Sequence, residues 1–388
     1  KSKIVESGDW NLSGERYKES LIANTDYEMV VLGKVLKTTS GGTPLKSKTE
    51  YYNNGTIPWL RSGEVSQGLI YHSELFITEK GLKESSAKLF PVDTVLVAMY
   101  GATAGQVGLL KFEASTNQAV CGILPDENFN PYYLYLILKS MKDEMIRLSG
   151  GGAQPNISQT IIKKFKIPLP PLSVQEEIVE EVDGYQKIID GARQVVDNYK
   201  PTIKIGPDWK MVKLGEVSEV ISGQSPKGEY YNSNGEGLAF YQGKTEFTEL
   251  KIGEPKKWTT QVTKEAYKND ILMSVRAPVG PVNFAIQHCC IGRGLAAIRV
   301  GEKVENVFVF NYLKSIQDKI KGSGGAVFDS INRQQISDLQ IPLPPLSVQQ
   351  EIVAQIEAEQ EMVNANKKLI EIYEQKIKDK IGEVWGEE

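Results

Sequence analysis

A stretch of thirteen residues occurs twice in this chain and constrains the fold more than any other feature. Ile167 to Val179 reads IPLPPLSVQEEIV, and Ile341 to Val353 reads IPLPPLSVQQEIV. Twelve of the thirteen positions are identical, at an offset of 174 residues. A near-identical segment at that distance indicates two copies of one domain-sized unit, and a chain of 388 residues is long enough for them.

Each copy predicts the start of a long helix. Its prolines favour an extended entry, and Ser173 or Ser347 then has Glu176 or Gln350 three residues later, the pattern of a capping box. Apolar positions follow at alternating spacings of four and three residues, which is typical of a coiled-coil seam. The seam positions are Ile178, Val182, Tyr185, Ile189, Ala192, Val196 and Tyr199 in the first copy, and Ile352, Ile356, Glu359, Val363, Asn366, Ile370 and Tyr373 in the second. Two unrelated surface helices are the alternative, and the matching seam phase argues against it.

Composition places the chain among ordinary globular proteins. Hydrophobic residues make up 40%, and neither a membrane-spanning run nor a signal peptide is evident in the sequence. Three cysteines form no disulfide framework, so we expect a cytoplasmic protein.

Charge is divided unevenly along the chain. The net charge of −4 argues against a nucleic-acid binder when the chain is taken as a whole. Residues 174–200 carry −4 and residues 348–388 carry −5, which leaves +5 on the rest. This division suits basic DNA-facing globules and acidic partner-facing helices, although long exposed helices are often charged for solvation alone.

The order of predicted elements is the same in both halves. A short strand is followed by Gly-rich, tyrosine-bearing loops, a hairpin, a strand-like segment (residues 116–123 or 291–298), a helix (131–148 or 307–321) and the proline run. We therefore predict an α+β fold, with two mixed α/β globules joined by two long antiparallel coiled-coil helices in a pseudo-two-fold internal repeat. The predicted divisions are an N-terminal extension (1–25), the first globule (26–166), the first spacer helix (167–205), the second globule (206–340) and the second spacer helix (341–388).

Helix length suggests a spacing between the globules. A first helix of roughly 26 residues is about 39 Å long, close to one turn of B-DNA at about 34–36 Å. Two modules held by such a spacer would contact two half-sites about one helical turn apart.

Catalytic and metal-binding patterns are hard to find in the sequence. It contains neither a P-loop nor a glycine-rich loop for S-adenosylmethionine. Asn130-Pro131-Tyr132-Tyr133 resembles an amino-methyltransferase loop only in part, and a helix start capped by Asn130 explains it better. His288-Cys289-Cys290 is the only metal-like cluster, and a buried strand is the better interpretation. We predict a binding protein without a catalytic residue, metal site or cofactor of its own.

The candidate DNA-binding residues are polar or aromatic side chains predicted on the turns of each globule. They are Lys46, Lys48, Tyr52, Arg61, Tyr100, Thr103 and Gln118 in the first half, and Lys227, Tyr231, Tyr241, Gln242, Lys244, Arg276 and Arg293 in the second. Arg suits guanine, Gln suits adenine, and Lys mostly holds phosphate. Arg61 and Gln242 occupy equivalent positions, so the scaffold repeats while the reading residues differ. We therefore expect an asymmetric target with two unlike half-sites.

This pattern resembles the DNA specificity subunit of type I restriction-modification systems, over residues 26–385. The carriers of the resemblance are the two IPLPPLSVQ segments, the hairpins GATAGQVG and RAPVGPV, and the Gly-Gly turns at residues 151–157 and 325–331. The resemblance implies that the globules are target recognition domains and the helices are spacers. It also implies a non-catalytic subunit that binds double-stranded DNA, two methyltransferase (modification) subunits and restriction subunits. S-adenosylmethionine would serve the methyltransferase, which acts on adenine N6.

Two other interpretations stay open from sequence. In the first interpretation, the chain is the specificity part of a fused methyltransferase-nuclease, which its initial Lys1 allows. The second is a protein-only scaffold that uses the coiled coil, and salt-insensitive association with DNA would favour it.

Overall fold

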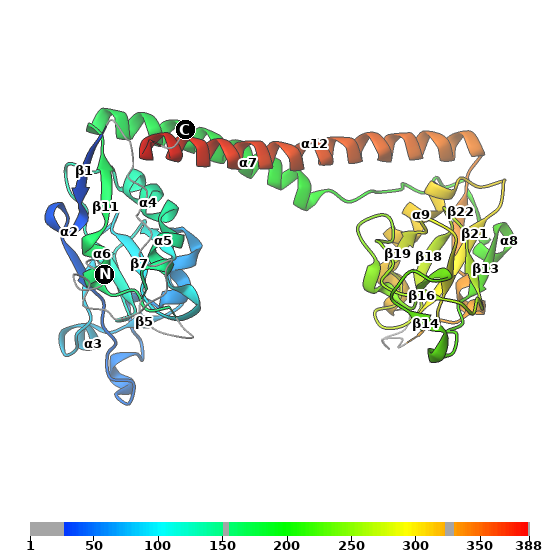
Figure 1. Cartoon of the computed structure of the whole chain (residues 1–388), viewed down its shortest axis with the longest axis horizontal. Helices are drawn as coiled ribbons and strands as arrows, with labels where there is room; N and C mark the ends of the chain where they lie inside the picture. Colours follow the sequence, from blue (N-terminus) through cyan, green and yellow to red (C-terminus); the bar gives the residue numbers. More distant parts are fainter. Residues whose placement is uncertain (1–26, 150–154, 323–329, 387–388) are drawn as a thin grey trace. The chain divides into compact units, whose positions relative to one another are not determined.

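The computed structural model describes residues 27–149, 155–322 and 330–386 (Figure 1). It forms two compact units, the first from Lys1–Arg193 with Lys368–Glu388 and the second from Gln194–Lys367. The predicted extension (1–25) and parts of both Gly-Gly turns lie outside the described residues. The predicted domain limits stay predictions, because the two units divide both long helices internally.

The first unit is built from three sheets. Its strands are β1 (Glu28–Val31), β2 (Thr38–Ser40), β3 (Ile57–Leu60), β4 (Leu69–Ile70), β5 (Phe76–Ile77), β6 (Leu89–Phe90), β7 (Val95–Ala98), β8 (Val107–Leu110), β9 (Ala114–Thr116), β10 (Val120–Ile123) and β11 (Lys166–Leu169). β1 pairs with β11, and the larger sheets have the orders β2-β10-β7-β8-β4 and β5-β3-β9-β6. Most pairs are antiparallel, but β3 runs parallel to β9 and β4 runs parallel to β8.

The helices of the first unit pack with two of its sheets. They are α2 (Leu32–Val35), α3 (Glu79–Lys83), α4 (Pro131–Ser140), α5 (Lys142–Arg147) and α6 (Gln159–Lys164), with the 3-10 turns η2 (Thr49–Tyr51), η3 (Ser62–Gln67) and η4 (Gly101–Thr103). Residues of α2, α4, α5 and α6 share a core with the larger sheet, and Leu82 of α3 packs with residues of β3 and β5. The core joins buried residues of β7, β8 and β10 to the continuous buried run Tyr133–Leu138 of α4. The predicted helix 131–148 is therefore two helices, and Asn130 caps the first as predicted, accepting hydrogen bonds from Tyr132 N and Tyr133 N.

The second unit repeats this arrangement with different residues. Its strands are β12 (Lys210–Lys213), β13 (Ser218–Ser222), β14 (Tyr231–Asn232), β15 (Leu238–Tyr241), β16 (Trp258–Thr259), β17 (Glu265–Ala266), β18 (Ile271–Ser274), β19 (Val282–Phe284), β20 (Cys289–Ile291), β21 (Leu295–Val300) and β22 (Gln340–Leu343). β12 pairs with β22, and the sheets have the orders β13-β21-β18-β19 and β14-β16-β15-β20-β17. β15 runs parallel to β20, as β3 does to β9. The repeat predicted from sequence is thus present in the strand pairing.

Short helices complete the second unit. They are α8 (Leu214–Val217), α9 (Asn306–Ser315), α10 (Gln317–Gly322) and α11 (Arg333–Ser337), with η5 (Gly228–Tyr230) and η6 (Lys244–Glu246). The predicted helix 307–321 is again divided in two. Both segments predicted as single strands, 116–123 and 291–298, are interrupted by turns, at residues 117–119 and 292–294.

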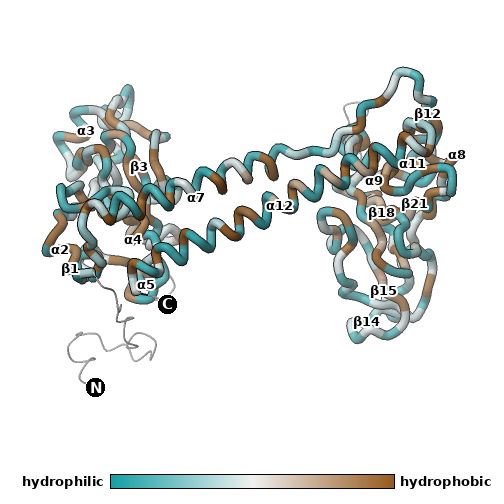
Figure 2. Tube along the Cα trace, turned by 90° about the horizontal axis from the view of Figure 1, so that it is seen from above, coloured by the Kyte–Doolittle hydropathy of each residue, from teal (hydrophilic) through white to brown (hydrophobic). Residues whose placement is uncertain are grey.

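Two long helices begin at the repeated segment, α7 (Leu172–Asn198) and α12 (Leu346–Trp385). Polar and apolar residues alternate along both (Figure 2). In the first unit, Lys380 Nζ lies 2.7 Å from Glu181 Oε2, and the Tyr185 and Tyr373 rings lie 5.3 Å apart. From Glu181 to Tyr185 on α7 the contacted residue of α12 moves back from Lys380 to Tyr373. The two helices therefore pair antiparallel, as predicted.

Burial along both helices follows the predicted seam except at the start of α12, where Val353 is buried and the predicted Ile352 is half-buried. Ile178, Val182, Ile189 and Ala192 are buried on α7, and Ile356 and Val363 on α12. The seam runs on beyond the predicted Tyr373, because Ile381 and Val384 are also buried and join the core of the first unit with Ile178 and Val182. Ser173 and Ser347 lie inside the first helical turn, so the predicted capping box is wrong.

Candidate nucleic-acid interface

The parallel pair of β3 and β9 brings two loops of the first unit together. Leu60 pairs with Thr116 at the end of β3 and β9, and Asn117 N donates to Leu60 O at 2.9 Å. Arg61 follows Leu60 directly, and its side chain is 53% exposed. Its guanidinium pairs with Glu74 Oε2 at 2.9 Å. The strand end therefore presents an exposed guanidinium beside the turn 117–119.

That turn carries Gln118, and a third segment packs against it. Gly42 N donates to Thr116 O at 2.8 Å, which fixes the loop after β2. The Thr43 hydroxyl then donates to Gln118 Oε1. Thr43, Arg61 and Gln118 lie on three loops that meet here, and we name them turn cluster 1.

The second unit builds the same point from equivalent bonds. Tyr241 pairs with Ile291, and Gly292 N donates to Tyr241 O at 2.8 Å. Gln242 follows Tyr241 and is exposed, so it occupies the position of Arg61, as predicted.

The turn 292–294 completes this second arrangement. Gln224 N donates to Ile291 O at 2.9 Å, as Gly42 N does to Thr116 O. Arg293 follows Gly292 as Gln118 follows Asn117, so it occupies the position of Gln118. Ser225 Oγ accepts from Arg293 N at 3.2 Å. We name Ser225, Gln242 and Arg293 turn cluster 2.

The hairpins contribute a further pair of predicted residues beside the turn clusters. Met99 N donates to Ala119 O at 2.8 Å, and Val275 N donates to Gly294 O at 3.0 Å. Tyr100 and Arg276 follow directly, are both exposed, and are therefore equivalent neighbours of the two turns. Thr103 lies half-buried on η4 at the tip of the first hairpin.

The predicted lysines are all exposed. Lys46, Lys48 and Lys227 lie on the loops after β2 and β13, and Lys244 begins η6 two residues after Gln242. Lys48 Nζ donates to the Tyr51 hydroxyl at 2.8 Å, and that bond raises the pKa of Lys48. Cations at these positions suit phosphate contacts near the turn clusters.

Three of the predicted tyrosines donate hydrogen bonds within their own units. Tyr241 is fully buried, its hydroxyl donates to Gly253 O at 3.0 Å, and burial raises its pKa to about 12. The prediction that it contacts DNA is therefore wrong. Tyr52 and Tyr231 are half-buried and donate to Pro44 O and Pro226 O at 2.5 and 2.8 Å. Both hold their loops in place.

Thr43 and Ser225 were missed as site residues by the sequence analysis. Both occur in a Ser-Gly-x-x-Pro segment, SGGTP at Ser40 and SGQSP at Ser222. The shared hydroxyl before the proline is the signal that could have identified them.

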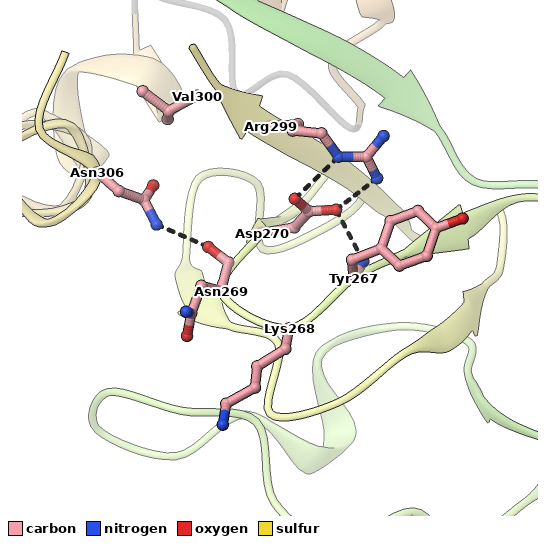
Figure 3. Close-up of a pocket in the computed structure, with 7 residues that line it drawn as sticks. All are labelled: Tyr267, Lys268, Asn269, Asp270, Arg299, Val300 and Asn306. Atoms are coloured by element: carbon pink, nitrogen blue, oxygen red, sulfur yellow. Dashed lines mark hydrogen bonds and ion pairs between the residues drawn. The ribbon is translucent and has the colours of Figure 1, made fainter. Parts of the chain in front are cut away.

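Another polar group lines a surface pocket of the second unit (Figure 3). Arg299 Nη2 lies 2.8 Å from Asp270 Oδ2, and this bond raises the pKa of Arg299. Tyr267 N donates to the same carboxylate oxygen at 2.8 Å, and Asn306 Nδ2 donates to Asn269 O at 2.7 Å. These groups bind one another and fix the turn before β18.

The described residues contain no cluster of His, Cys, Asp and Glu that could hold a metal ion. Cys289 and Cys290 are buried on β20, and burial raises the pKa of Cys289 to about 12. His288 is exposed instead and lies 2.9 Å from Glu265. Every helix among the described residues is too short or too polar to span a membrane.

Sequence comparison finds specificity subunits among the relatives of this chain. The MjaX type I restriction enzyme specificity subunit of Methanocaldococcus jannaschii is 36% identical over 289 residues, covering 66% of this chain and 68% of the relative. The EcoR124I/EcoR124II specificity subunit of Escherichia coli is 31% identical over 179 residues, 44% of each chain. This second alignment spans less than half of the relative's length.

Solved structures and a family model extend the match over most of the chain. A chain from a structure of type I R-M system assembly has a TM-score of 0.68 at 26% identity and covers 95% of this chain and 99% of that one. The HsdS subunit from Thermoanaerobacter tengcongensis has a TM-score of 0.53 at 25% identity, with 96% and 99% covered. The family model described as type I restriction modification DNA specificity domain matches residues 24–196 and 207–374. The chain therefore belongs to the family of type I restriction modification DNA specificity domains and carries two copies of that domain.

Proposed function

We propose that this protein selects the DNA target of a type I restriction-modification complex, with each unit reading one half of an asymmetric bipartite sequence. One observation carries this proposal. The two units repeat the same loop-anchoring hydrogen bonds yet present different side chains there, Arg61 and Gln118 in one and Gln242 and Arg293 in the other. A repeated scaffold with unlike reading residues suits two unlike half-sites.

The charge distribution supports a division of labour. Residues 174–200 carry a net charge of −4 and residues 348–388 carry −5, whereas the rest of the chain carries +5. The basic part suits DNA, because phosphate neutralisation dominates affinity. The acidic helices also expose apolar side chains, among them Ile188 and Met362, a combination that suits protein partners.

The chemistry in this proposal belongs to the partners. A specificity subunit is non-catalytic, so this chain would bind two modification subunits that methylate adenine N6 with S-adenosylmethionine, together with restriction subunits. The contribution of this chain is the choice of sequence.

The test is a genome-wide map of N6-methyladenine in a methylation-free host that expresses this chain with its cognate modification subunit. We expect two short, unlike blocks separated by a fixed gap. A palindromic motif would contradict the asymmetric target. The same motif in cells without this chain would contradict the function itself, and the protein would then act as a scaffold.

A further inference from the structure

The two turn clusters differ by an exchange. Position A is the residue that follows β3 or β15, and it holds Arg61 in the first unit and Gln242 in the second. Position B is the centre of the turn that follows the parallel partner strand, and it holds Gln118 in the first unit and Arg293 in the second. Each unit therefore presents one guanidinium and one carboxamide, in opposite order. The equivalence of the positions comes from main-chain hydrogen bonds, so it does not depend on side-chain similarity.

These two groups are the best matched to purine edges in the major groove. A guanidinium donates two parallel hydrogen bonds to guanine O6 and N7, and a carboxamide pairs with adenine N6 and N7. The side chains at positions A and B can therefore pair with a purine in both units. In the first unit position A prefers guanine and position B adenine, and in the second unit the preferences are reversed.

The contacts within the clusters leave these groups able to bind DNA. The ion pair of Arg61 joins two exposed side chains, 53% and 63% accessible, and pairs of that kind are weak enough to exchange for a base contact. Thr43 occupies one lone pair of Gln118 Oε1, and the amide oxygen has a second. Ser225 binds the main-chain N–H of Arg293, which leaves the guanidinium exposed.

We propose that positions A and B are specificity-determining in both units, so that the two half-sites contain a G·C pair and an A·T pair in exchanged places. Position A selects G·C through Arg61 in one half-site and A·T through Gln242 in the other. Position B selects A·T through Gln118 and G·C through Arg293. This inference rests on the proposed function and adds the residues that choose the bases.

The test exchanges the two residues within one unit. The double variant Arg61→Gln/Gln118→Arg conserves both the net charge and the composition of the cluster. The variant is placed in the full complex with its modification subunit, and its methylated motif is compared with that of the original protein. We expect the G·C and A·T positions of one half-site to exchange, with a preference of roughly 5- to 150-fold at each. The other half-site and the gap stay unchanged.

The reciprocal variant Gln242→Arg/Arg293→Gln is the matched control. It should change only the second half-site. If either double variant methylates nothing, the single variants Arg61→Gln and Gln242→Arg are mapped, each with one altered base pair expected.

Outcomes separate the two proposals. An unchanged motif in the variants, or loss of all methylation by the single variants with unaltered thermal unfolding, overturns the exchange but leaves the proposed function standing. Failure of the original protein to direct any bipartite motif overturns the proposed function.

Discussion

Two buried glutamines show how single residues position this fold. Gln175 is fully buried, its Nε2 donates to Asn128 O and Pro170 O at 3.0 and 2.9 Å, and its Oε1 accepts from Asn130 N at 2.8 Å. Gln349 makes equivalent bonds to Pro344 O and from Glu305 N, both 2.8 Å. One side chain thus ties the proline turn to the N-cap residue of an earlier helix in each unit, α4 in the first and α9 in the second.

Replacing Gln175 with Met should destabilise the first unit. Met fills similar space but leaves Asn130 N and two carbonyls without their partner, so we expect a loss of about 1–3 kcal/mol in the free energy of unfolding. Denaturant unfolding followed by circular dichroism measures it. Glu176→Gln, an exposed neighbour changed to the residue of the second repeat, is the control. Equal stability of Gln175→Met and the original protein would show that the tie is unimportant.

The sequence predicted the residues of the interface unevenly. Arg61 and Gln242 could be matched because each follows a strand with clear β-branched and aromatic character. The turns that carry Gln118 and Arg293 were predicted as strand because their flanking residues, such as Val120 and Leu295, are apolar. The prediction that Tyr241 contacts DNA was wrong for a related reason, because only the sheet order reveals that this tyrosine at the end of a strand faces the interior.

At the scale of elements, heptad spacing predicted the helix pair, while its far end could not be predicted. A seam of period 3.5 fixes which face is buried, but not that Ile381 and Val384 enter the core of the first unit. That packing depends on tertiary structure. The same is true of the polar tie between the helices, in which Lys380 Nζ lies 2.7 Å from Glu181 Oε2.

We expect Lys380→Ala to weaken the helix pairing modestly. Glu181 is 39% exposed, so solvent screening limits the pair to about 0.2–1 kcal/mol. The hydrogen bond from Lys380 lowers the pKa of Glu181, so this stability is present above the ordinary carboxyl pKa and is lost as pH falls through the lowered one.

The measurement is thermal unfolding between about pH 3 and 7, which spans the ordinary Glu pKa of about 4.3. Lys380→Ala should show a smaller loss of melting temperature toward acid than the original protein. Lys378→Ala, an exposed lysine on the same helix, serves as the control and should keep the original slope. Identical slopes for Lys380→Ala and Lys378→Ala would exclude a role of this pair in acid stability.

At the scale of the whole molecule, the repeat predicted two globules, and each compact unit has cores of its own. Buried residues of β7, β8 and α4 form the main core of the first unit, and those of β18, β19 and α9 form that of the second. The offset of the IPLPPLSVQ segments was enough to predict this. The points at which the two long helices divide between the units could not be predicted from sequence. Helix periodicity shows which face is buried but not which unit each helical turn packs against.

Separate cores predict that damage to one unit stays local. Gln349→Met removes in the second unit the tie that Gln175→Met removes in the first, so the two substitutions are matched. Hydrogen exchange followed by mass spectrometry should show faster exchange in β18 and β21 for Gln349→Met, and in β7 and β10 for Gln175→Met, because local opening reports the stability of each cooperative unit. Faster exchange in all four strands for either variant would mean that the units unfold together, and that half-site choice and folding are coupled across the chain.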